Sequence, residues 1–99
     1  MIKSRIAPAA RADLRDIRVY SKAAFGAAVA RRYLAGLRNA LTLLRDRPNA
    51  GAPEHDLGDG MRGFAYRSHR IYYRLDERGL LIVRILHHAR DAAAIEDLL

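Results

Sequence analysis

The sequence predicts an α+β fold: an N-terminal strand, an antiparallel helical hairpin, and then three antiparallel strands that form one small sheet packed on the helices. Three observations support this prediction. Apolar residues recur at helical spacing over residues 8–46, they alternate at a period of two over residues 61–86, and a loop rich in proline and glycine separates the two regions. Because both patterns leave one apolar face, the helices and strands are expected to bury those faces against each other.

The length and composition limit what such a chain can be. Its 99 residues fit a single domain, residues 1–99, and an apolar content of 51% is high enough for a core and too high for disorder. Without cysteine, neither a disulfide framework nor a cysteine zinc site is possible. The sequence has no apolar run of membrane-spanning length and no signal peptide, so we expect a cytoplasmic protein that does not bind membranes.

The charge is strongly basic, with 18 Lys and Arg against 11 Asp and Glu and a formal net charge of +7. All of these cations except Lys3 and Lys22 are arginines, whose planar guanidinium groups pair with carboxylates and phosphates alike. The excess therefore indicates either a solvated basic surface or a surface for an acidic protein or a nucleic acid, and charge alone does not choose between them.

The first half of the chain is predicted to hold a short strand over residues 2–7 and two helices. Pro8 begins the first helix, where the missing N–H of proline costs nothing, and Gly26 separates it from a second helix over residues 27–46. Such a short turn favours an antiparallel hairpin. The apolar stripe of the second helix is expected to lie in the core and contains Ala30, Tyr33, Leu34, Leu37, Leu41 and Leu44.

The last third of the chain is predicted to form three strands with defined faces. A three-residue loop that ends with Gly79 in the left-handed conformation pairs Asp76 with Leu80. A tight turn at Ser68-His69 pairs the strand over residues 61–67 with the next one. The residues that this register places on the inner face are Phe64, Tyr66, Ile71, Tyr73, Leu75, Leu81, Val83 and Ile85.

The outer face of this sheet is the candidate binding surface. It is expected to be a shallow trough, because Gly63 and Ala65 contribute almost no side-chain bulk to the first strand. Guanidinium groups gathered on one small face repel one another, which favours a partner that neutralises them over an ordinary solvated face. The residues expected to line the trough are Arg67, Arg70, Tyr72, Arg74 and Arg84, with Ile82, Leu86 and His88 completing that face.

Few kinds of catalysis are compatible with the sequence. No Walker loop, dinucleotide-binding glycine pattern or HExxH pattern is present, so we expect no cofactor and no metal site. A ribonuclease stays open, because RNA cleavage needs groups that transfer protons and cations that hold the phosphate. In that interpretation His88 or Tyr72 transfers protons, and the phosphate is held by Arg70, Arg74 and Arg84. His87, on the inner face, is instead expected to be a hydrogen-bonded core histidine.

Several segments, taken in order, resemble the RelE/ParE superfamily of type II toxins. Residues 12–20 (ADLRDIRVY) are similar to its first helix, and residues 44–51 (LRDRPNAG) are similar to the end of its second helix. Residues 60–64 (GMRGF) and 69–74 (HRIYYR) are similar to its second and third strands. Residues 84–91 (RILHHARD) are similar to the end of the ParE branch. The resemblance covers nearly the whole chain. Each segment alone is a weak sign of the family, and their occurrence together in this order is what makes the resemblance specific.

This resemblance implies a function and partners. Toxins of the ParE branch poison DNA gyrase without an active site of their own, whereas those of the RelE branch cut mRNA in the ribosome. A co-expressed antitoxin, ParD-like in the ParE branch, neutralises the toxin in a hetero-oligomer and binds the operator DNA, which the toxin contacts only indirectly. The tail after Arg90 contains no Tyr, Lys or Arg, which fits the ParE branch. The resemblance therefore adds Arg90 to the residues expected to contact antitoxin or target, and it leaves a RelE-like nuclease or a non-toxic interaction module as alternatives.

The end of the chain is predicted to close the domain. Asp91 is expected to cap a last helical turn. Ile95, Leu98 and Leu99 would then share one face, which either covers Ile82 and Leu86 or contacts the target.

Overall fold

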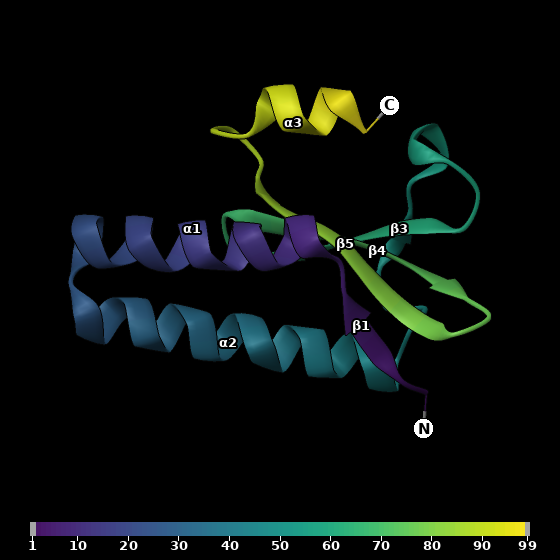
Figure 1. Cartoon of the computed structure of the whole chain (residues 1–99), viewed down its shortest axis with the longest axis horizontal. Coiled ribbons are helices and arrows are strands. Elements are labelled where there is room, and N and C mark those ends of the chain that lie inside the picture. The colour runs from purple at the N-terminus through teal and green to yellow at the C-terminus, as the bar shows by residue number, and fades with distance from the viewer. Residues whose placement is uncertain (1, 99) are drawn as a thin grey trace.

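The computed structural model describes residues 2–98 and confirms the predicted order of elements (Figure 1). In chain order these are β1 (Ser4–Ile6), α1 (Pro8–Phe25), α2 (Ala27–Asp46), β2 (Ala52–Pro53), the 3₁₀ turn η1 (His55–Leu57), β3 (Met61–Tyr66), β4 (His69–Asp76), β5 (Gly79–His87) and α3 (Ala92–Asp97). The strands form one sheet in the order β1-β5-β4-β3-β2, in which β1 is parallel to β5 and the other pairs are antiparallel. The sequence analysis missed β2 and η1, which lie in the segment expected to be a loop.

The two long helices form the predicted antiparallel hairpin, and its closed end extends beyond the sheet (Figure 1). Four residues of the predicted stripe of α2 are buried, namely Ala30, Leu34, Leu37 and Leu44. Ala40 of α2 and Ala10 and Ile17 of α1 are buried as well. Near the closed end the helices extend past the strands of residues 2–98, so large apolar side chains remain in solvent. Val19 is 68% exposed and Phe25 is 62% exposed.

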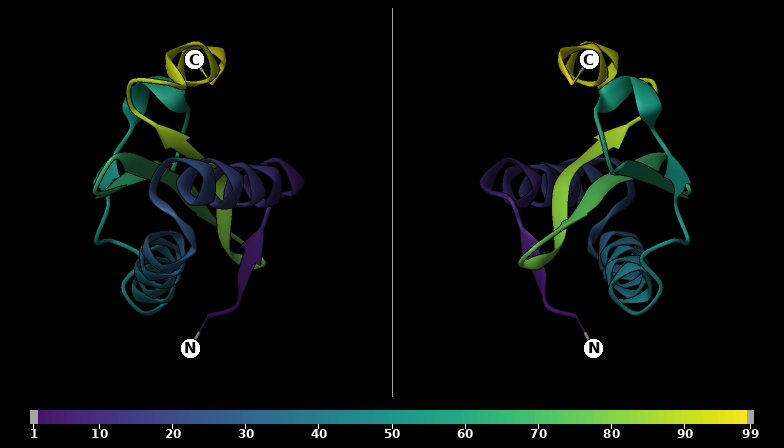
Figure 2. Two further views of the ribbon diagram at one scale, coloured as in Figure 1. Left: turned by 90° about the vertical axis from the view of Figure 1, so that its left-hand side faces the viewer. Right: turned by 90° about the vertical axis from the view of Figure 1, so that its right-hand side faces the viewer.

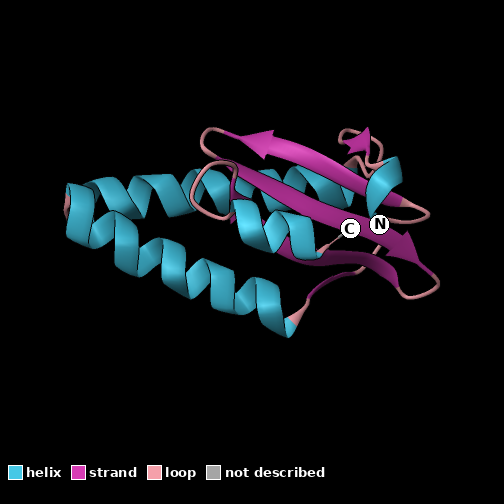
Figure 3. Cartoon of the chain, turned by 90° about the horizontal axis from the view of Figure 1, so that it is seen from above, coloured by secondary structure: helices cyan, strands magenta, loops and turns pink. Residues whose placement is uncertain are grey.

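The sheet separates the molecule into layers, with the hairpin against one face and α3 over the other (Figures 2 and 3). The main core fills the space between the hairpin and the sheet, and Ile71, Tyr73 and Ile85 of the sheet lie in it as predicted. The Tyr73 hydroxyl accepts a hydrogen bond from Gly51 N–H at 2.8 Å and donates one to the Pro48 carbonyl at 2.6 Å. Tyr73 therefore ties the loop that follows α2 to the core.

The register of the β4–β5 hairpin differs from the prediction near its turn. Gly79 does adopt a left-handed conformation (φ 110°), but it pairs with Asp76 itself, so that Leu80 rather than Leu81 is opposite Leu75. An extra residue in β5, between the pairs Tyr73–Ile82 and Tyr72–Arg84, then restores the predicted register. The bulge turns Leu80 and Ile82 into the core, where they are 0% and 1% exposed. Ile82 was therefore wrongly predicted on the outer face, and Leu81 and Val83 on the inner face.

A second correction concerns the turn between β3 and β4. Arg67 and Ser68 form this turn, with Arg67 at φ 50°, and His69 already belongs to β4, opposite Tyr66. The prediction that Phe64 and Tyr66 face the helices is nevertheless confirmed, because both pack on the main core. The same shift moves Arg67 out of the sheet.

The outer face of the sheet is not an open trough. Tyr72, Met61 and Leu86 form a second apolar cluster, which Ile95 and Leu98 help to cover. The end of the chain thus closes over the sheet as predicted, but over this cluster rather than over Ile82; Leu99 lies outside the described residues.

Candidate functional site

Arg84 does not point freely into solvent but clamps α1 to β5. Its Nε and Nη2 atoms donate hydrogen bonds of 2.8 and 2.9 Å to the two carboxylate oxygens of Asp13. Asp13 is only 8% exposed and also accepts the Ile85 N–H at 2.9 Å. The bidentate pair raises the pKa of Arg84, chiefly through the hydrogen bonds to Asp13. Arg84 is therefore a structural residue before it is a binding residue.

Arg70 is also partly engaged within the chain, by Glu54. Its guanidinium group makes an ion pair with Glu54, with Nη2 and Nε at 2.6 and 2.8 Å from Oε1. A Cβ atom at Gly63 would lie 2.5 Å from both the Arg70 Nε and the Glu54 Oε1. The space above Gly63, which the sequence analysis interpreted as part of an open trough, is thus filled by this ion pair.

The other predicted site residues separate into a covered one and several exposed ones. Tyr72 is only 5% exposed, because the apolar cluster beneath α3 buries it, and this burial raises the pKa of its phenol. Arg67, Arg74, His88 and Arg90 are exposed. Arg67 lies in the turn with its guanidinium carbon 5.9 Å from the centre of the Tyr66 ring. The structure does not bring these residues into one continuous trough.

The helical hairpin carries a groove that the sequence analysis did not find. A cavity of about 620 Å³ lies between α1 and α2 near their closed end. Its lining is Arg18, Val19, Lys22, Ala23, Ala27, Ala30, Arg31 and Leu34. Small apolar residues from both helices face the groove, and three exposed cations border it. The sequence feature that could have indicated this groove is Val19, an apolar residue that lies away from the buried face of α1.

A cluster of histidines lies where the hairpin meets the ends of the strands. His69 is buried (6% exposed), and its Nδ1 is 2.6 Å from the hydroxyl of Tyr33 on α2. Burial, assisted by His87 and Arg90, lowers the pKa of His69 to about 4. His87 is only half-buried, contrary to the prediction of a core histidine, although its Nδ1 does accept hydrogen bonds from Ala89 and Arg90 N–H. The histidine buried in the core is His69, which the sequence analysis had placed in the turn between two strands.

Asp91 begins α3 as predicted, but its carboxylate does not cap the helix. Instead Oδ2 accepts the N–H of His87 at 2.7 Å. Residues 2–98 contain no group of histidine and carboxylate side chains arranged to hold a metal ion. In the same part of the chain, no helix combines the length and apolar character needed to cross a bilayer.

Comparison with known proteins connects this fold and these surfaces to one family. The family model described as "ParE toxin of type II toxin-antitoxin system, parDE" matches residues 5–92. The chain therefore belongs to the ParE toxin family of type II toxin–antitoxin systems. This confirms the resemblance to the ParE branch that the sequence analysis found.

Relatives and a solved structure agree with this membership. The chain is 34% identical to Toxin ParE1 of Caulobacter vibrioides over 90 residues, which are 91% of this chain and 93% of that protein. It is 30% identical to Toxin ParE1 of Mycobacterium tuberculosis over 87 residues, covering 87% and 89% of the two chains. A structure of the chromosomal ParDE TA system from P. aeruginosa superimposes with a TM-score of 0.77 at 20% identity, over 88% of this chain and 96% of that one. At that identity the superposition shows a shared fold.

Proposed function

We propose that this toxin acts in the cytoplasm by binding DNA gyrase and poisoning it, without an active site of its own, and that a ParD-like antitoxin neutralises it. Family membership supports the toxin role, and the family's known action on gyrase supports the target. The observation that carries the binding mechanism is the state of Tyr72 and Arg84. The first is buried under α3 and the second is held by Asp13, so neither is presented to an RNA backbone.

The target is tested with purified, folded protein in a gyrase assay that scores supercoiling and trapped, cleaved DNA. We expect trapped cleavage, and we expect Tyr72→Phe and His88→Gln to retain it because neither side chain transfers a proton in the proposed mechanism. A nuclease predicts the opposite pattern: mRNA cleaved on translating ribosomes, lost in both variants, and gyrase unaffected. Folded protein without either activity would favour the non-toxic interaction module.

The groove between α1 and α2 is the surface that we propose for the antitoxin. Its apolar lining suits the apolar face of an amphipathic helix, and its cationic border, Arg18, Lys22 and Arg31, suits acidic residues on the flanks of that helix. The net charge of +7 would accelerate the encounter with an acidic segment. The exposed residues Arg67, Arg74 and Arg90, with the partly covered Arg70, then stay available for the target.

Reversing the charge on both sides of this groove should weaken antitoxin binding. For the double variant Arg18→Glu/Arg31→Glu we expect the Kd for the cognate antitoxin to rise at least tenfold, mostly through slower association, because border charges steer encounter. Surface plasmon resonance measures the association and dissociation rates separately, and measurements at low and high salt show how far the association rate depends on charge. The matched control is Arg47→Glu/Arg78→Glu, which has the same net charge but changes exposed residues outside the groove. Equal losses in the two double variants would contradict the assignment of the groove.

A further inference from the structure

A second, smaller cavity lies on the other side of the helical hairpin, where α1 and α2 meet the β3–β4 turn and the end of β5. Its volume is about 220 Å³. One wall is apolar and aromatic, with Tyr20, Phe25 and Val29, and the other is polar, with Ser68, His69, His87 and Arg90. None of its lining residues is a carboxylate. The cavity therefore combines an apolar surface with a set of hydrogen-bond donors.

His69 is hydrogen-bonded to the helical hairpin through one ring nitrogen. The Tyr33 hydroxyl lies 2.6 Å from the His69 Nδ1, and the tautomer of His69 decides which of the two groups donates. Burial raises the pKa of the Tyr33 phenol, so the phenol keeps its proton and is able to donate. With the hydroxyl as donor, the ring proton of neutral His69 is on Nε2, which has no hydrogen-bond partner among the described residues.

The tautomer of neutral His87 is fixed by backbone hydrogen bonds. Its Nδ1 accepts two backbone hydrogen bonds, from Arg90 N–H at 2.9 Å and Ala89 N–H at 3.1 Å, so its proton is also on Nε2. The two rings lie edge to face with centroids 5.3 Å apart. Arg90 adds a third donor: its guanidinium carbon lies 3.8 Å from the centre of the Tyr20 ring, a stacking that leaves the N–H edge free for a bidentate contact.

We propose that this cavity binds a small organic oxyanion, a carboxylate or phosphate attached to an aromatic or aliphatic group. The oxygens would accept hydrogen bonds from Arg90 and from the Nε2–H groups of His69 and His87. The apolar group would pack on Tyr20, Phe25 and Val29. This assigns the toxin a ligand site that is separate from the groove between the helices.

The electrostatics of the cluster are consistent with this ligand. Burial is the main cause that lowers the pKa of His69 and of His87; Arg90 lowers the pKa of both rings further, and Asp91 raises it. Two of the neighbouring carboxylates accept other hydrogen bonds, since Asp91 accepts the N–H of His87 and Asp13 holds Arg84. Arg90 makes no ion pair with the described residues, so its charge is available to an oxyanion.

The test titrates the isolated toxin with phenyl phosphate, 3-phenylpropionate and inorganic phosphate, followed by NMR of the backbone and imidazole groups. We expect at least one of the phenyl compounds to shift His69, His87 and Arg90 together, and to bind at least tenfold more tightly than inorganic phosphate. The ratio between the two phenyl compounds identifies the anionic group. Imidazole ¹⁵N shifts should show the Nε2–H form of both rings. Neither gyrase nor antitoxin is needed, so the result is independent of the proposed function.

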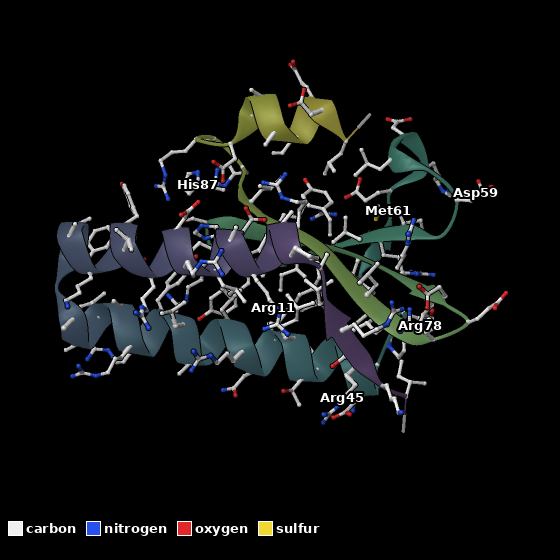
Figure 4. All side chains as sticks on the ribbon, viewed as in Figure 1. Arg11, Arg45, Asp59, Met61, Arg78 and His87 are labelled. Atoms are coloured by element: carbon white, nitrogen blue, oxygen red, sulfur yellow. The ribbon has the colours of Figure 1, made fainter. Side chains whose placement is uncertain are left out.

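Matched variants decide whether the cavity is the site. Arg90→Ala should weaken binding about tenfold or more, the expected effect of losing a charged hydrogen bond. Arg78→Ala removes the same charge from the β4–β5 turn, far from His87 (Figure 4), and should bind like the wild type. Three results would overturn the proposal: no shift at His69 and His87 with either phenyl compound, equal losses in the two variants, or the Nδ1–H form of His69.

Discussion

Replacing Asp13 with alanine is expected to lower the free energy of unfolding by about 3–5 kcal/mol, the effect of removing one partner of a buried ion pair. The reason is that one carboxylate satisfies three donors. Asp13 accepts hydrogen bonds from Nε and Nη2 of Arg84 and from the N–H of Ile85, and it is itself 8% exposed. Its loss would leave a charged group and a backbone N–H without partners at the interface of α1 and β5.

Urea denaturation at pH 7 measures this effect. The control is Asp16→Ala, which removes an exposed carboxylate one turn further along the same helix and should change stability by less than about 1 kcal/mol. Toxicity should disappear in Asp13→Ala because little folded protein is left, whereas Asp16→Ala should keep its fold. A folded, fully stable Asp13→Ala protein would contradict the structural role assigned to the clamp.

The same ion pair shows where prediction from sequence stops. The helical period and the turn residues around Gly26 are local signals, and both helices follow them. The pairing of Asp13 with Arg84 joins residues 71 positions apart, and no local pattern reports such a contact. The sequence analysis therefore predicted that Arg84 contacts another molecule, whereas in the structure it is paired with Asp13 of the same chain.

In the strands, the sequence predicted the elements and the turn but not the register of pairing. Alternation in β4 and β5 predicted the strands, and Gly79 predicted the turn with its left-handed conformation. The bulge opposite Tyr72 and Tyr73 was not predictable, because Leu80, Leu81, Ile82 and Val83 are all apolar and allow either face to be buried. In the structure Ile82 lies opposite Ile6 of β1, and it is Leu80 and Ile82 that are buried. A run without alternation leaves the register to tertiary contacts.

Acidification should destabilise the protein through His69. Burial, with the nearby charges of His87 and Arg90, lowers the pKa of His69 to about 4, whereas the same imidazole in the unfolded chain has a pKa of about 6.5. Between these values the unfolded state binds more protons, so the free energy of unfolding falls as the pH is lowered. From pH 7 to pH 5 this single group should remove about 2 kcal/mol.

The variant His69→Gln isolates this contribution. Glutamine can still hydrogen-bond to the Tyr33 hydroxyl but does not titrate, so the loss of stability between pH 7 and pH 5 should be about 2 kcal/mol smaller than in the wild type. His87 would still titrate, since its pKa is also lowered by burial and by Arg90, and part of the pH dependence should therefore persist. His55→Gln, in the exposed η1 turn, is the control and should follow the wild-type curve. An unchanged pH dependence in His69→Gln would show that the buried imidazole is already protonated at pH 5 in the folded state.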